Sequence, residues 1–148
     1  MLRGLASLYN FRGEVDKAAQ IGREMLAFAE RENNPRMLID GHLLLGTPMM
    51  FVNDLQGGLD HLDRAISLFP AVPTHAFSSR GGGNDPRVAC FTTSAFTLWL
   101  LGYPDRAVER VNGALTLAVE LDHPFTSAFA RFHSGLLHFW RVASLTPC

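Results

Sequence analysis

Hydrophobic residues recur along this chain every three or four positions, which is the period of an amphipathic helix. Seven segments carry the pattern, and short polar or Gly/Pro-containing breaks separate them. Alternating hydrophobic and polar runs are few, and no Asn-Gly or Asp-Gly turn lies between β-branched stretches, so strand signals are nearly absent. The pattern therefore predicts an all-α protein.

Three of the breaks, at Gly13, Asn53 and Gly102, align as the turns of one repeated helical hairpin. In each copy a small residue stands seven positions before the turn, and another stands five positions after it. The members of these two columns are Ala6, Gly46 and Ala95 before the turn, and Ala18, Gly58 and Ala107 after it. Small side chains at matched positions predict that the two antiparallel helices of each hairpin approach closely.

The break at Gly102 contains the residues expected of a corner between two helices. Gly102 can adopt the left-handed conformation that ends a helix. Pro104 fits the first turn of the next helix, where its missing N–H costs nothing, and Asp105 places negative charge near the positive end of that helix. We predict one domain, residues 1–148, with repeats at about 1–34, 37–70 and 87–122 and an extra helix at 125–141.

A loop interrupts the regular spacing of the repeats. The first two turns are 40 residues apart and the second and third are 49 apart, so about nine extra residues fall in the Pro-, Gly- and Ser-rich segment 71–86. This composition predicts a flexible loop, with a ligand lid as the alternative. The stretch "RGGGNDP" at 80–86 lacks both the Gly-Lys-Ser/Thr of a phosphate-binding loop and the G-x-G-x-x-G of a dinucleotide-binding loop.

Charge and hydropathy exclude several classes of partner. The 13 basic and 14 acidic residues give a formal net charge of -1 without a basic stripe, which argues against direct nucleic-acid binding. No apolar run approaches the roughly 18 residues of a membrane-spanning helix, and the first residues lack the features of a signal peptide. We therefore expect no membrane association and a cytoplasmic location. The two cysteines, Cys90 and Cys148, have no disulfide-framework or zinc-site spacing.

Residues for catalysis or metal binding are present without the spacing that such sites need. Six histidines are scattered along the chain, and His133 and His138 are five positions apart rather than the three or four that would place both on one helix face. Asp60 and Asp63 share a helix face but lie in a polar stretch. No HExxH motif, nucleophile elbow or triad signature occurs. We therefore predict a protein that is not an enzyme and that needs no cofactor or metal.

The repeated columns resemble the tetratricopeptide repeat (TPR). The stretches "LASLYNFRGEVDKAAQIGREML" (5–26) and "SAFTLWLLGYPDRAVERVNGAL" (94–115) carry the small residue of the first helix, the Gly of the turn and the Ala five positions later. Residues 85–130 are also similar to the TPR region of large bacterial multidomain regulators, which combine an ATPase module with such repeats and often a class III nucleotide cyclase domain. None of the nucleotide-binding or cyclase residues of those regulators occurs here, so the resemblance implies no catalytic role.

The resemblance implies a right-handed superhelix of three antiparallel helix pairs, with the seventh helix covering the open end. In TPR arrays the first helix of each pair lines a concave groove that binds extended or helical peptides. By matched position, the candidate groove residues are Asn10, Phe11, Met50, Phe51, Phe96 and Trp99. For Phe96 and Trp99 the alternative is packing between neighbouring helices.

The leading functional hypothesis is therefore a non-catalytic scaffold that binds a protein or peptide, as a fragment or relative of a bacterial signalling or transcriptional regulator. One alternative is a structural spacer or oligomerisation element, in keeping with an apolar C-terminal end that could self-associate. A second alternative is small-molecule sensing through the Gly-rich loop and the adjoining groove.

Overall fold

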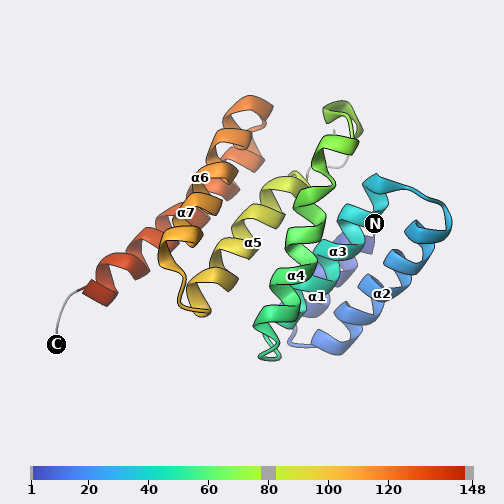
Figure 1. Cartoon of the computed structure of the whole chain (residues 1–148), viewed down its shortest axis with the longest axis horizontal. Coiled ribbons are helices and arrows are strands. Elements are labelled where there is room, and N and C mark those ends of the chain that lie inside the picture. Colours follow the sequence, from blue (N-terminus) through green and yellow to red (C-terminus); the bar gives the residue numbers. More distant parts are fainter. Residues whose placement is uncertain (1, 78–82, 146–148) are drawn as a thin grey trace. The chain divides into compact units, whose positions relative to one another are not determined.

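A computed structural model describes residues 2–77 and 83–145, and in this part of the chain all regular structure is helical, as predicted (Figure 1). The α-helices are α1 (Leu2–Phe11), α2 (Val15–Arg31), α3 (Pro35–Met49), α4 (Leu55–Ser67), α5 (Pro86–Leu100), α6 (Pro104–Leu121) and α7 (Pro124–Leu145). Two short 3-10 helices, η1 (Phe69–Ala71) and η2 (Thr74–Phe77), follow α4.

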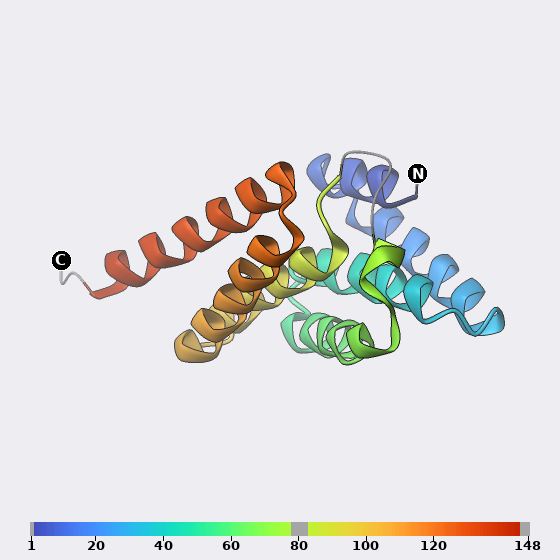
Figure 2. The same cartoon turned by 90° about the horizontal axis from the view of Figure 1, so that it is seen from above.

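The contacts divide the chain into two compact units, an N-terminal unit (Met1–Ser78) and a C-terminal unit (Ser79–Cys148). In the N-terminal unit α1 packs on α2, α2 on α3 and α3 on α4, and Figure 1 shows α3 between α2 and α4. In the C-terminal unit α5 pairs with α6, and α7 packs on both of them; Figure 2 shows α7 running beside α6.

The three aligned turns share one backbone conformation. Gly13, Asn53 and Gly102 have φ angles of 74°, 63° and 86°, which lie in the left-handed region. Glycine enters this region without a steric penalty, and asparagine is among the few other residues that do so routinely. The middle repeat therefore keeps the same turn although it lacks the glycine of the other two.

The same hydrogen bond closes each of these turns. The donor is the backbone N–H of the residue after the left-handed one. The acceptor is the carbonyl of the residue four positions before the left-handed one, as in a Schellman motif. The three N···O distances are 2.9 Å for Glu14 to Tyr9, 3.1 Å for Asp54 to Met49 and 2.9 Å for Tyr103 to Leu98. The repeat read from the sequence is therefore a repeat of backbone geometry as well.

The two small-residue columns lie where the paired helices meet. The four alanines of these columns are buried. A Cβ atom built on Gly46 would lie 2.8 Å from the carbonyl oxygen of Gly58, and one built on Gly58 would lie 3.0 Å from the carbonyl oxygen of Gly46. The backbones of α3 and α4 therefore touch at this point, which leaves no room for a side chain on either glycine.

Part of segment 71–86, predicted as a flexible loop, is packed in the structure. Val72 and Phe77 are buried, and the Arg36 guanidinium of α3 lies 4.9 Å from the centre of the Phe77 ring. The Nε of Arg36 also donates to the Ala76 carbonyl at 3.3 Å. Apolar anchors thus hold residues 69–77 although the composition suggested a loop. The alternative of a ligand lid concerned the Gly-rich stretch at 80–86, and residues 80–82 of it lie outside the described residues.

Candidate binding surface

The six predicted groove residues divide between the two units. Asn10 and Phe11 end α1, and Met50 and Phe51 follow α3, so these four belong to the N-terminal unit. The other two, on α5, belong to the C-terminal unit. Asn10 and Met50 are half-buried, whereas Phe11 and Phe51 are exposed.

Phe96 packs between helices. Its ring centre lies 5.2 Å from that of Trp140 and 5.4 Å from that of His133, both on α7. Trp99, which lies on α5 like Phe96, is half-buried. The packing alternative therefore describes Phe96, because tilted aromatic contacts at these distances stabilise a helix interface.

A large exposed apolar side chain recurs at the corner of each of the three aligned hairpins. Phe11, Phe51 and Leu100 each stand two positions before the left-handed residue of the turn, and they are 90%, 60% and 52% exposed. We call these three the corner residues. The three corner residues occupy one aligned position, which reads Phe, Phe and Leu in the sequence. The groove prediction placed Phe11 and Phe51 on one helix face with Asn10 and Met50, which are half-buried in the structure.

Two of the corners carry a second exposed apolar side chain. Val52 follows Phe51 directly. Tyr103 lies directly before α6, and the Arg106 guanidinium is 5.4 Å from the centre of its ring. Burying one such side chain against a partner contributes about 1.5–3 kcal/mol. Each corner can therefore act as a small apolar anchor, with its rigid turn holding the side chain in place.

A histidine pair, in which His42 is buried and His61 is half-buried, joins α3 to α4. The Nδ1 atoms of His42 and His61 are 2.9 Å apart, so the N–H of one ring donates a hydrogen bond to the ring nitrogen of the other. Burial, with smaller contributions from His61 and Arg64, lowers the pKa of His42 to about 4. Burial also lowers the pKa of His61, against the opposing effect of the Asp60 and Asp54 carboxylates.

Acid is therefore expected to weaken the N-terminal unit. The pKa of His42 is about 4 in the folded protein and 6.5 ordinarily, so between these values the unfolded chain binds a proton that the folded protein does not. The N-terminal unit therefore keeps its full stability above pH 6.5 and loses part of it as the pH falls toward 4. We expect the free energy of unfolding to fall by about 3 kcal/mol over this range. Denaturant unfolding at pH 7, 5.5 and 4 measures it. The double variant His42→Leu/His61→Leu should flatten this dependence, and an equal slope in that variant would show that the pair is not its cause.

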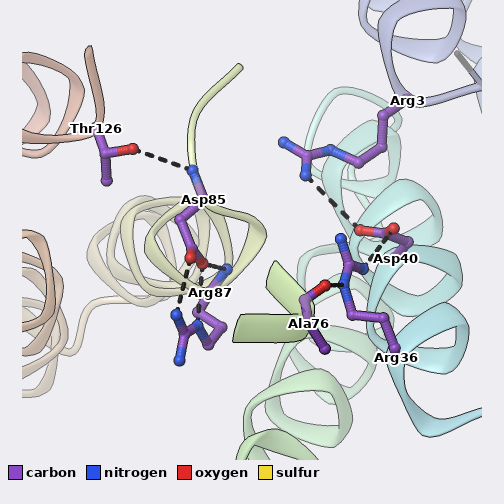
Figure 3. Close-up of polar contacts among 7 residues, drawn as sticks. All are labelled: Arg3, Arg36, Asp40, Ala76, Asp85, Arg87 and Thr126. Atoms are coloured by element: carbon purple, nitrogen blue, oxygen red, sulfur yellow. Dashed lines mark hydrogen bonds and ion pairs between the residues drawn. The ribbon is translucent and has the colours of Figure 1, made fainter. Parts of the chain in front are cut away.

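Two polar clusters hold elements together inside the separate units (Figure 3). In the N-terminal unit Asp40 lies 2.6 Å from Arg36 Nη1 and 3.8 Å from Arg3 Nη1, which connects α1 to α3. In the C-terminal unit the buried Asp85 carboxylate pairs with Arg87 at 2.9 Å. The Asp85 N–H donates to Thr126 Oγ1 of α7 at 3.3 Å. Both clusters link elements within one unit and serve packing, and the buried Asp40 Oδ1 accepts no hydrogen bond.

Within residues 2–77 and 83–145 there is no group of three or more His, Cys, Asp or Glu side chains able to hold a metal ion. No described helix combines the length and the apolar character needed to cross a bilayer. Comparison with protein-family models and with curated proteins found no match.

Proposed function

We propose that this chain is a non-catalytic scaffold that binds a protein partner through its hairpin corners. The observation that carries the proposal is the corner column: three hairpins of one backbone geometry each expose a large apolar side chain at the same position. The repeated hairpins also support a TPR-like arrangement of three helix pairs followed by α7. The binding element we propose is the corner, in place of the helix-lined groove suggested by the sequence.

The exposure of the corners favours binding over an inert spacer. A spacer gains nothing from a phenylalanine that is 90% exposed, whereas exposed aromatic side chains are common anchors of protein interfaces. A side chain held on a hydrogen-bonded turn also loses little conformational entropy when it binds. Following the resemblance of residues 85–130, we place this scaffold in a bacterial signalling or transcription-control assembly in the cytoplasm.

The corners can be removed without disturbing the fold, because their side chains are exposed. We expect the triple variant Phe11→Ser/Phe51→Ser/Leu100→Ser to keep the wild-type melting curve within about 0.5 kcal/mol. Affinity capture from the source organism, quantified by mass spectrometry, should show a protein that wild type retains and the triple variant loses at least tenfold.

The matched control is Phe28→Ser/Val119→Ser, which removes two exposed apolar side chains away from the corners. The control should retain the captured protein as wild type does. Equal capture by wild type and the triple variant would contradict the proposal, and so would equal losses in the triple variant and the control.

A further inference from the structure

Helix α7 has two opposite apolar faces, of which one packs inside the C-terminal unit. Its buried residues, Thr126, Ala130, Ser134 and Leu137, face α5 and α6. At 100° per residue, four large apolar residues lie on the opposite side of the helix. Phe125, Phe132, Phe139 and Val142 on that side are 54%, 66%, 67% and 65% exposed.

The exposed face follows a heptad pattern in which large and small residues alternate. With Phe125 at position a, phenylalanine occupies each a position, and the d positions hold Ala128, Gly135 and Val142. Ala128 and Gly135 are exposed as well, and a Cβ atom on Gly135 would have no neighbour within 4 Å. The face is therefore a row of projections separated by gaps, over the length of the helix.

We propose that this face pairs with the same face of a second copy, with the two α7 helices antiparallel about a two-fold axis. When the axis passes between His133 and Ser134, every large residue meets a smaller one. The layers pair Phe125 with Val142, Ala128 with Phe139, and Phe132 with Gly135, each residue contacting the named residue of the second copy. Alternation of large and small residues across facing positions is how helix interfaces fill space, and a two-fold interface requires this self-complementarity.

The residues on either side of the exposed face of α7 are compatible with this pairing. On one flank lie the half-buried apolar side chains of Phe129 and Leu136, which would meet each other across the interface. On the other flank Arg131 would face His138 of the second copy. Helix α7 contains no acidic residue, so this flank gains no ion pair, and the apolar layers provide the binding energy.

The size of the contact sets the expected affinity. The stripe from Phe125 to Val142 is about 25 Å long at 1.5 Å per residue. One helix pair of this length falls at the low end of specific interface sizes, so we expect a reversible dimer with a dissociation constant of about 10–100 µM. This dimer does not depend on the corner residues, so the proposed function and this inference can fail independently.

The test is sedimentation equilibrium of the full chain at about 5–500 µM, a range that brackets the expected dissociation constant. Gly135→Phe fills the gap that receives Phe132 of the second copy, and we expect it to weaken the dimer at least tenfold. The substitution replaces an exposed helical glycine with open space around it, so its melting temperature should equal or exceed that of wild type. The matched control is Gly4→Phe, at an exposed glycine of α1 that also has open space around it.

Two further variants test the register itself. Phe132→Ala/Gly135→Phe exchanges large and small within one layer, so it should restore the dimer that Gly135→Phe loses. His138→Glu places a carboxylate opposite Arg131 of the second copy twice per dimer, and should tighten it about threefold to tenfold at low salt.

A wild-type chain that stays monomeric throughout would overturn the proposal. A dimer that Gly135→Phe leaves intact, or that the exchange variant does not restore, would also overturn it, because the dimer would then use another face or register. Binding of an acidic amphipathic peptide by a monomeric wild type would assign the face to a different partner.

Discussion

Replacing Gly46 with leucine is expected to destabilise the N-terminal unit severely. A Cβ atom at this position would lie 2.8 Å from the Gly58 carbonyl oxygen and 2.9 Å from Leu62 Cγ, and the carbonyl belongs to a helix backbone that cannot move locally. We expect Gly46→Ala to cost about 1–3 kcal/mol and Gly46→Leu to cost more than about 3 kcal/mol. Since a domain of this size has only about 5–15 kcal/mol of stability, Gly46→Leu is the most damaging single change that we foresee.

Urea unfolding followed by circular dichroism measures these costs. The control is Gly4→Leu, which also puts leucine on a helical glycine, but at a position with open space around it. Gly4→Leu should keep or raise the midpoint, because glycine is a poor helix former. A Gly46→Leu variant as stable as Gly4→Leu would show that α3 and α4 do not touch through these glycines.

The second large effect is expected at the buried ion pair that begins α5. Asp85 caps the helix by accepting from the Arg87 N–H at 2.8 Å, and its carboxylate also accepts from the Arg87 side chain at 3.1 Å and 2.9 Å. Asp85→Ala removes the cap and leaves a buried guanidinium without this carboxylate. We expect a loss of about 3–5 kcal/mol in the free energy of unfolding of the C-terminal unit.

A double variant separates the two parts of this effect. Asp85→Ser/Arg87→Leu keeps a capping hydroxyl and removes the buried charge, so it should recover at least half of the lost stability. For comparison, Lys17→Met breaks the exposed Lys17–Glu14 pair on α2 and should have no measurable effect. If Asp85→Ala proves as mild as Lys17→Met, the buried pair does not stabilise the start of α5.

Local backbone chemistry made the hairpins predictable from the sequence. The turn residues favour the left-handed conformation by themselves, and the small-residue columns follow from where two helices must cross, so Gly13, Gly102 and even Asn53 lie where the alignment placed them. Prolines and capping residues at helix starts added equally local signals. The helix boundaries therefore needed little knowledge of the tertiary structure.

The binding surface was harder to predict because exposure depends on contacts between distant residues. Phe96 and Phe51 belong to similar apolar stretches, yet α7 covers the first and the second stands in a turn. The pairing of His42 with His61 likewise depends on the register of two helices, 19 residues apart in sequence. Residues 69–77 are packed because Phe77 is buried beside Arg36 of α3, and the composition of the segment does not reveal this contact.

Photo-crosslinking at single positions in the source organism shows whether the corners contact a partner. The photoreactive residue p-benzoylphenylalanine replaces Phe51 in one strain and, as a control, the exposed Val119 of α6 in another. We predict a covalent adduct with another protein from position 51 that does not form from position 119. Adducts of equal yield from both positions, or none from position 51, would show that the corner at Phe51 does not bind a partner.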